Sequence, residues 1–241
     1  MTATPGRYDG RRRVLLAIDT ATSRCLVATA SAAGRLDGVT TWPAGYRHGE
    51  TLLPTIGRFL GEQNVRRSRL SGIIVGTGPG AFTGLRVGLA TAKTLAATMA
   101  LPIVGVSTGE ALLAAARAGA ESGAGHAAPE RFVLLLPAGP SDRIAVRPGE
   151  APTLLPGGTD PELARDETLI ALDLPDRAPD AALVRGERAW TGFAAALVGL
   201  GVERLVRGEV DDPAALVPEY VTLPRGVGAA EGEVTWSRDL R

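Results

Sequence analysis

From Gly76 to Arg86 the sequence reads Gly76-Thr77-Gly78-Pro79-Gly80-Ala81-Phe82-Thr83-Gly84-Leu85-Arg86, between an apolar run that ends at Val75 and a helical pattern that ends at Met99. Glycine adopts positive φ and lets other groups approach its backbone closely, while proline fixes its own φ, so Gly78-Pro79-Gly80 predicts a rigid turn. We expect Thr83 to be the N-cap of the helix that follows. A strand, a glycine turn and a helix N-terminus together make a natural phosphate cradle.

Two nucleotide-binding motifs can be tested on this turn. A Walker loop needs Lys-Ser or Lys-Thr after its last glycine, and here Leu85 follows Gly84. Residues 76–81 fit a dinucleotide fingerprint, but the region that should hold its ribose-binding acid reads Leu101-Pro102-Ile103-Val104-Gly105. A tight turn that lets helix and strand pack closely is therefore favoured over either motif.

The same stretch carries a family resemblance. Gly78 to Arg86, with Ala92-Lys93 after it and both Ile18-Asp19-Thr20-Ala21-Thr22 and His48-Gly49-Glu50-Thr51-Leu52-Leu53-Pro54 before it, resembles the TsaB (YeaZ) family over roughly residues 13 to 115. Members of that family are non-catalytic dimerisation subunits of the bacterial machinery that makes tRNA threonylcarbamoyladenosine. The resemblance implies an α/β protein of the two-lobed actin-like, sugar kinase and Hsp70 superfold, with mixed sheets flanked by helices.

The resemblance also implies partners and a location. The chain is expected to support the catalytic threonylcarbamoyl transferase subunit TsaD and the small ATPase TsaE in the cytoplasm, away from membranes, and not to be an enzyme on its own. The alternative is an active ATP-dependent phosphotransferase or carbamoyltransferase of the same superfold. No tightly bound cofactor is expected. The sequence leaves open whether ATP or ADP binds at a complex interface, and whether the free chain forms a homodimer.

Composition sets further limits. A hydrophobic fraction of 45% and a charged fraction of 22% are those of a soluble globular protein, and a single cysteine, Cys25, excludes an internal disulfide framework. The formal net charge is zero, so we expect tRNA to be bound only indirectly, through another subunit. Arginines 11–13 precede Val14 to Ile18, which is too short for a signal peptide, and no apolar run reaches transmembrane length.

Hydrophobic patterns predict two lobes and a tail, with boundaries at residues 1–117, 118–212 and 213–241. An antiparallel meander (14–18, 25–31, 36–42) opens the first lobe, which continues as strand, helix, strand and helix after Leu70. A Gly- and Ala-rich linker is expected at residues 118–128. The second lobe lacks the Asp-Ala-Arg motif usual in the family, and is expected to hold a hairpin (132–136 with 143–146), a short strand in 169–174 and a helix over 190–200. We expect the tail from Arg225 to be mobile.

Asp19 directly follows the first expected strand, at the position where proteins of this superfold place an acid that handles metal. The turn after it is Thr20-Ala21-Thr22-Ser23, whose β-branched side chains obstruct the close approach that glycine would permit. We therefore expect at most a vestigial nucleotide or phosphate site, formed by Asp19, Thr20, Gly78, Gly80, Arg86 and Lys93.

Two other kinds of chemistry are disfavoured. A metal site is not expected, because the chain has one cysteine and two unpaired histidines, His48 and His126; the missing histidine pair also disfavours a metallopeptidase. Gly105-Val106-Ser107-Thr108-Gly109 fits the nucleophile elbow of serine hydrolases, but no suitably spaced acid and histidine follow it. A capping box from Ser107 to Glu110 explains the serine without catalysis.

Two helices of the first lobe are candidates for a partner interface. One is expected over Thr51–Gly61 with Thr51 as N-cap; the other, Thr83–Met99, has few polar residues on any side. Gly84, Gly88 and Ala92 recur every four residues, a small-residue stripe that lets another helix approach closely. Because TsaB proteins pair through helices of this lobe, we favour an interface over core packing, formed by Leu53, Ile56, Gly84, Leu85, Gly88, Leu89 and Ala92.

Overall fold

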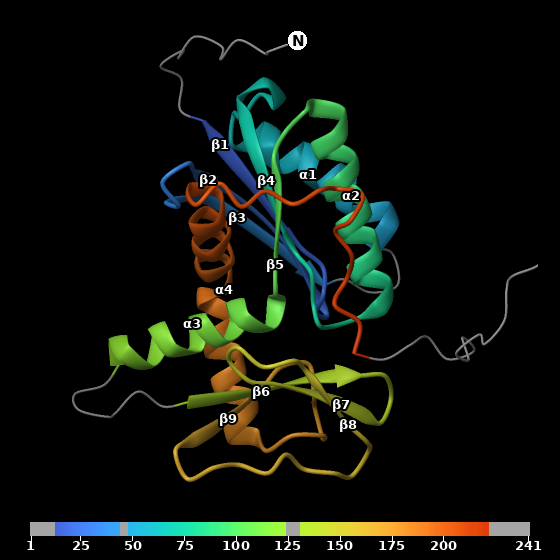
Figure 1. The fold of residues 1–241 in the computed structure, drawn as a ribbon, viewed down its shortest axis with the longest axis vertical. Helices are drawn as coiled ribbons and strands as arrows, with labels where there is room; N and C mark the ends of the chain where they lie inside the picture. Colours follow the sequence, from blue (N-terminus) through green and yellow to red (C-terminus); the bar gives the residue numbers. More distant parts are fainter. Residues whose placement is uncertain (1–12, 44–47, 124–130, 222–241) are drawn as a thin grey trace, which may run out of the picture.

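The computed structural model describes residues 13–43, 48–123 and 131–221, arranged as two α/β lobes (Figure 1). A five-stranded sheet with strand order β3-β2-β1-β4-β5 forms the first lobe, and a four-stranded sheet with order β8-β7-β6-β9 forms the second. Both sheets are mixed, so the predicted fold class is confirmed. The linker predicted at residues 118–128 is wrong for residues 118–123, which belong to helix α3 (Thr108–Gly123). Its remaining residues, with His126, and the tail from residue 222 lie outside the described residues.

The first sheet begins with the predicted antiparallel meander of β1 (Val14–Asp19), β2 (Arg24–Ser31) and β3 (Leu36–Pro43). Strands β4 (Leu70–Gly76) and β5 (Ile103–Val106) then continue parallel on the other side of β1. All six residues of β1 are buried, as expected of a strand covered on both faces, whereas half-buried and exposed residues alternate along the edge strand β3.

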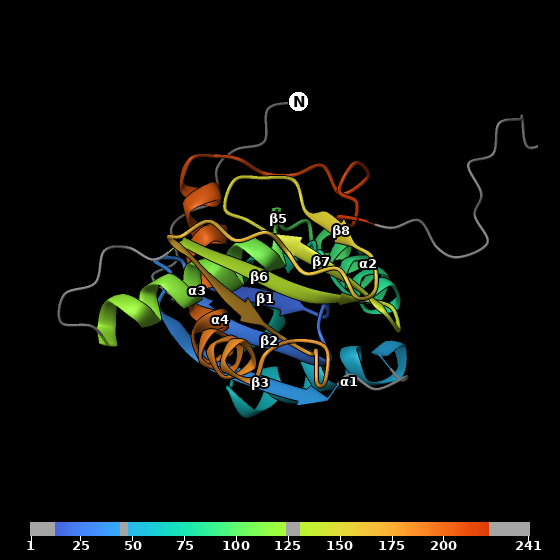
Figure 2. The same cartoon turned by 90° about the horizontal axis from the view of Figure 1, so that it is seen from below.

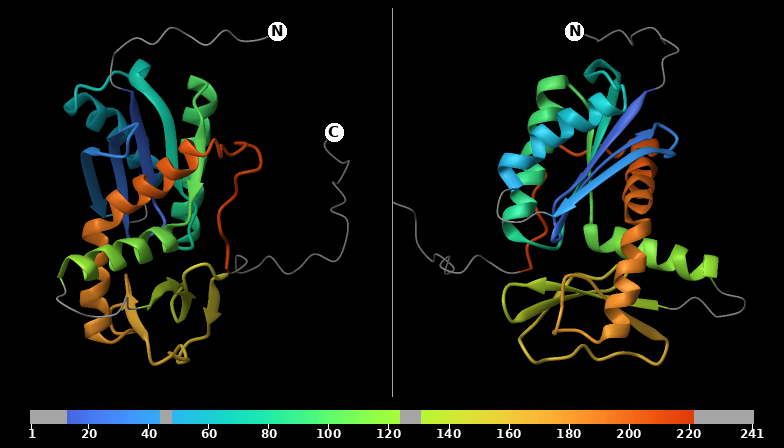
Figure 3. Two further views of the ribbon diagram at one scale, coloured as in Figure 1. Left: turned by 60° about the vertical axis from the view of Figure 1, so that its left-hand side comes forward. Right: turned by 180° about the vertical axis from the view of Figure 1, so that it is seen from behind.

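Helices cover both faces of this sheet (Figure 3, right). Because side chains alternate along a strand, Leu16 and Ile18 of β1 pack with α1 (His48–Glu62) and α2 (Phe82–Met99), whereas Leu15 and Ala17 pack with α4 (Asp180–Val206). Helix α3 (Thr108–Gly123) follows β5, and a short 3₁₀ helix (Arg67–Arg69) precedes β4.

Both predicted threonine N-caps are wrong. Helix α1 begins at His48, so Thr51 is already helical and Pro54 lies beyond the first turn. Helix α2 has Ala81 at its N-cap, where no side chain donates or accepts a capping hydrogen bond. The main chain fixes this start, because the carbonyl of Ala81 accepts the first helical bond from the N–H of Leu85 at 2.9 Å.

The second sheet contains the predicted hairpin, formed by β6 (Arg131–Ala138) and β7 (Asp142–Val146). Strand β8 (Thr153–Leu155) extends it, and β9 (Glu167–Ala171) pairs parallel with β6. The sequence placed a strand within residues 169–174 and a helix over 190–200. The structure places β9 slightly earlier and gives α4 a length of 27 residues.

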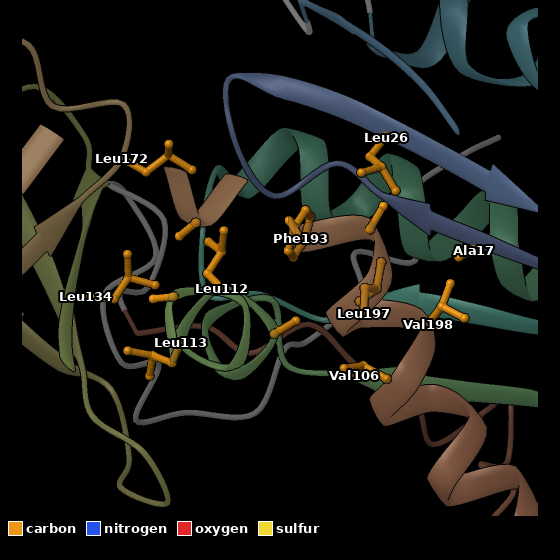
Figure 4. Close-up of a cluster of buried hydrophobic side chains, with 14 of the residues drawn as sticks. Ala17, Leu26, Val106, Leu112, Leu113, Leu134, Leu172, Phe193, Leu197 and Val198 are labelled. Atoms are coloured by element: carbon orange, nitrogen blue, oxygen red, sulfur yellow. The ribbon is translucent and has the colours of Figure 1, made fainter. Parts of the chain in front are cut away.

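Helix α4 joins the two lobes, and α3 lies beside it (Figure 2). Near its start the backbone of α4 nearly touches β9, since a Cβ added at Gly186 would lie 1.8 Å from the carbonyl oxygen of Ala171. Near its end, a Cβ at Gly201 would lie 2.7 Å from Ile74 of β4. Figure 4 shows Phe193 and Leu197 of α4 between Leu26 of the first lobe and Leu134 and Leu172 of the second, in one continuous core.

By length and composition α4 could also span a membrane, and it is the one helix of the described residues that could. Here its apolar side chains are used in the core that joins the two lobes, because Phe193, Leu197 and Val198 are fully buried. Of the apolar window that gives α4 this composition, 33% is buried inside the chain.

After α4 the chain returns to the first lobe. The N–H of Asp211 donates to the carbonyl of Ile103 at 2.9 Å, and its carboxylate accepts two hydrogen bonds of 2.9 Å from Arg204. Further on, the N–H of Glu219 donates to the carbonyl of Thr77 at 2.7 Å. Residues 211–221 therefore pack against the first lobe, although the sequence pattern places them after the second.

Candidate functional site

The predicted vestigial site lies where β1, β4 and β5 end, and its centre is the carboxylate of Asp19. Asp19 is fully buried; its Oδ1 accepts from the N–H of Ala21 at 3.0 Å and its Oδ2 from the hydroxyl of Thr108 at 2.6 Å. Burial raises the pKa of Asp19 to about 6, against the opposing effect of these two hydrogen bonds. Sequence reasoning missed Thr108, which directly follows Ser107 in the elbow motif.

The glycine turn packs against this carboxylate. A Cβ at Gly76 would lie 1.7 Å from Oδ2 of Asp19, so only glycine fits there. Gly78 has φ +106°, and its carbonyl accepts a hydrogen bond of 2.7 Å from the N–H of Thr108. A Cβ at Gly80 would lie 2.1 Å from the carbonyl oxygen of Ala21. The predicted reasons for glycine are thus both found: positive φ at Gly78 and close packing at Gly80.

Main-chain groups of this turn are already hydrogen-bonded within the protein. The N–H of Gly78 donates to the hydroxyl of Thr108 at 3.1 Å, and the N–H of Ala81 donates to the carbonyl of Ala21 at 2.7 Å. A cavity of about 520 Å³ lies elsewhere, between α3 and α4, and is lined by residues such as Ala115 and Gly192. The turn that could cradle a phosphate is instead folded onto the turn between β1 and β2.

The small-residue stripe of α2 faces the core, contrary to our prediction of a partner interface. The hydroxyl of Thr20 donates to the carbonyl of Gly84 at 2.7 Å, and a Cβ at Gly88 would lie 2.1 Å from the same hydroxyl oxygen. The close neighbour of the stripe is therefore the chain's own turn after β1. Of the seven predicted interface residues, only Leu53 is exposed, at 55%; those buried are Ile56, Gly84, Leu85, Gly88, Leu89 and Ala92.

Arg86 and Lys93 are not part of the Asp19 site either. The Nε of Arg86 donates to the hydroxyl of Tyr220 at 2.9 Å, and its guanidinium lies 3.8 Å from the ring centroid of Phe82. The ammonium of Lys93 donates to the carbonyl of Leu216 at 3.0 Å. Both cations bind the returning C-terminal segment, so the expected site retains only Asp19, Thr20, Gly78 and Gly80.

Ser107 caps α3 as predicted, but the reciprocal half of the capping box is not formed, because Oε1 of Glu110 accepts from the N–H of Gly149 at 2.8 Å. Its hydroxyl oxygen accepts from the N–H of Glu110 at 3.4 Å and lies 3.1 Å from the carbonyl of Gly78 and 3.2 Å from Oε2 of Glu219. Burial raises the pKa of Glu219, and the nearby charge of Glu110 adds to this shift. The serine thus anchors the glycine turn and the C-terminal segment. Among the described residues, no group of three His, Cys, Asp or Glu side chains could hold a metal ion.

An exposed surface does exist on the other side of α1. Gly49, Leu53, Gly57 and Gly61 recur every four residues and are all exposed. A Cβ added at any of the three glycines would meet no atom within 4 Å. The exposed residues of α2 include Arg86, Ala90, Thr94 and Ala97, at similar spacing. We call this outer face of α1 and α2 the outer helix face; it combines these small residues with charged side chains such as Arg58 and Glu62 of α1, which form an ion pair of 2.7 Å.

The fold and the closed strand-end site define a class: two-lobed α/β proteins in which the glycine turn packs onto the first strand. Residues 27–164 match the family model TsaD, described as tRNA N6-adenosine threonylcarbamoyltransferase, and this is more than half of the chain. The chain therefore belongs to that family, and the relatives it matches place it with the TsaB (YeaZ) proteins.

Two curated relatives carry the name tRNA threonylcarbamoyladenosine biosynthesis protein TsaB. The Escherichia coli protein is 36% identical over 99 residues, which are 39% of this chain and 40% of that protein. The Bacillus subtilis protein is 39% identical over 70 residues, 29% of this chain and 31% of that protein. The matched stretch thus spans well under half the length of these relatives.

A solved structure extends the likeness to most of the chain. YeaZ from Pseudomonas aeruginosa has 28% sequence identity and a TM-score of 0.61, and the match covers 86% of this chain and 99% of that one. The second lobe, which the sequence resemblance barely reached, is therefore also shared with YeaZ at the level of the fold.

Proposed function

We propose that this chain is a non-catalytic partner subunit that binds a TsaD-type transferase and supports the formation of N6-threonylcarbamoyladenosine in tRNA. The observation that carries the proposal is the closed site at Asp19, in a chain that belongs to the family. The carboxylate is fully buried, and the turn that would receive a phosphate is bonded to Thr108 and Ala21. Such a chain would contribute a surface to the cytoplasmic tRNA-modifying complex.

The outer helix face is the surface we assign to the TsaD-type partner. Glycines spaced four apart on α1 leave its backbone open to a second helix, and Leu53 offers an exposed apolar side chain at the centre of the row. The same face would pair two copies of the chain when the partner is absent. A TsaE-type ATPase is a further proposed member of the complex.

We also propose that the chain alone binds no nucleotide tightly, and that any ATP or ADP binds where the partner completes a site. The rival function, an active ATP-dependent transferase, rests on Asp19 at the end of β1. It predicts ATP turnover by the purified chain that is lost in Asp19→Ala. We expect turnover at background level in both proteins, measured as phosphate release.

The main experiment is native mass spectrometry of the chain alone and with the TsaD-type subunit from the same source. We expect a heterocomplex at micromolar concentrations, and Leu53→Arg should weaken it at least tenfold because the charge would be buried against the partner. Val184→Arg is a matched control, since Val184 is similarly exposed at 51% but lies at the other end of the molecule, on α4.

Both variants should keep the melting temperature of the parent protein, because neither side chain is buried. Absence of a heterocomplex would remove the main support for the proposal. Equal binding by Leu53→Arg and Val184→Arg would place the interface away from the outer helix face.

A further inference from the structure

The zero net charge hides an uneven distribution along the chain. Residues 1–70 contain eleven arginines and five acidic residues, whereas residues 148–182 contain eight acidic residues and two arginines. The described residues of the first segment, 13–43 and 48–70, lie in the first lobe, and residues 148–182 lie in the second lobe. The first segment therefore carries an excess of positive charge that the net charge of the whole chain does not reveal.

The structure gathers many of these arginines at one end of the first lobe. Val14 at the start of β1 pairs with Leu70 of β4 on one side and with Ser31 of β2 on the other. Arg13, the turn that carries Arg35, and the 66–69 segment therefore share this end, which is the one farther from the second lobe (Figure 1).

Two of these arginines have no evident role in the fold. Arg66 and Arg67 are both exposed, and neither forms an ion pair with a described residue. Other arginines of this segment do form ion pairs: Arg35 pairs with Asp37 at 2.5 Å, and Arg58 pairs with Glu62 at 2.7 Å. The apolar residues on either side of the pair, Val65 and Leu70, pack into the core and hold this segment in place.

We propose that this end of the first lobe, centred on Arg66 and Arg67, binds the phosphate backbone of RNA. A guanidinium presents its N–H donors in a planar fork that suits phosphate oxygens, and such contacts need no base sequence. The proposal rests on the proposed function, which brings tRNA to the complex. It revises our expectation from net charge that the chain meets tRNA only through another subunit.

Two features favour RNA over a membrane surface. No large hydrophobic side chain is exposed between residues 58 and 70, all of which are described, whereas membrane-surface segments pair basic residues with an apolar face. Helix α1 ends at Glu62, so the arginines lie just beyond the outer helix face. RNA held by a partner on that face could extend onto them.

The test compares the double variant Arg66→Ala/Arg67→Ala with the control Arg117→Ala/Arg165→Ala. The control arginines are also exposed, but one lies on α3 and the other in the second lobe. Fluorescence anisotropy with a labelled, transcribed tRNA would be measured from 50 to 200 mM salt, for the chain alone and for its complex with the TsaD-type subunit.

For the Arg66/Arg67 variant we expect affinity about tenfold weaker and a slope of log affinity against log salt smaller by roughly 1.5, because two phosphate contacts are lost. The control should match the parent protein in both quantities. Equal loss in the two variants, or no loss in either, would overturn the proposal.

Other outcomes separate this proposal from the proposed function. If the Arg66/Arg67 variant formed the heterocomplex with normal affinity, and that complex bound RNA as tightly as the parent complex, the inference alone would be overturned. RNA binding that depends on the pair in a chain forming no heterocomplex would overturn the proposed function alone. Loss of binding to phosphatidylserine vesicles, with RNA binding unchanged, would assign the arginines to a membrane and overturn the proposal.

Discussion

Helices α1 and α2 carry similar rows of small residues with opposite surroundings. On α2, Gly84, Gly88 and Ala92 are buried, and a Cβ at Gly88 would lie 2.1 Å from the hydroxyl oxygen of Thr20. On α1, Gly57 and Gly61 have the same spacing but are exposed, with no atom within 4 Å of an added Cβ. The spacing of small residues shows that another segment can approach the helix backbone closely. It does not show whether that segment belongs to the same chain or to a partner.

Glycine-to-leucine substitutions on the two helices should differ most in their effect on the free energy of unfolding. Gly88→Leu places a bulky side chain where the Thr20 turn already touches α2, so we expect it to lower the free energy of unfolding by roughly 3 kcal/mol. Gly57→Leu, in open space, should leave it nearly unchanged or slightly higher. Urea denaturation followed by circular dichroism would measure both.

This expectation replaces the one drawn from sequence, in which Gly88→Leu weakened partner binding in a chain that stayed folded. A Gly88→Leu protein with parental stability and lost binding would restore the original interface. Similar destabilisation by both substitutions would remove the contrast between the two helices.

The buried carboxylate of Asp19 should make the stability of the protein depend on pH. The pKa of Asp19 is raised from 3.8 to about 6 on folding, so its protonated form favours the folded state. The stability of the parent protein relative to Asp19→Asn should therefore be greatest below pH 4 and fall by on the order of 2 kcal/mol as pH rises to about 6.

Urea denaturation at pH 4, 5, 6 and 7 would test this difference. Glu121→Gln is the control for the removal of a carboxylate, because Glu121 is exposed on α3. A difference that grows with pH would mean that the hydrogen bonds from Thr108 and Ala21 outweigh burial at Asp19.

The smallest expected effect is a gain in stability from a substitution in the exposed glycine row of α1. Gly57→Ala should raise the free energy of unfolding by about 0.5 to 1 kcal/mol, because alanine loses less backbone freedom in a helix and meets no neighbour here. A thermal melt of the isolated chain would detect this shift. A lower melting temperature would reveal a packing constraint at Gly57 that its open surroundings do not show.

Much of the fold was predictable because its signals are local. The apolar runs gave the meander of β1 to β3 and the β6–β7 hairpin, and the glycine turn marked the change from strand to helix before α2. Helix starts were predicted less well, since a threonine near a helix start is a common cap. At Ala81 the main chain alone begins the helix.

The candidate site was predicted only in part. Asp19, Thr20, Gly78 and Gly80 do come together, because they follow strands that end at the same edge of the sheet. Arg86 and Lys93 do not join them, since the C-terminal segment supplies their partners Tyr220 and Leu216 from more than 120 positions away. No local pattern marks a contact of that kind.

The sequence by itself determined the glycine turn, the meander of β1 to β3, the β6–β7 hairpin, and the reasons for glycine at Gly78 and Gly80. Local sterics and hydrophobic periodicity are sufficient for those features. Only the tertiary structure decided that Asp19 is closed in by Thr108, that the α2 row faces Thr20, and that arginines from separate segments share one end of the first lobe. These features depend on residues such as Thr20 and Gly84, which are 64 positions apart and become neighbours only when the sheet and its helices have packed together.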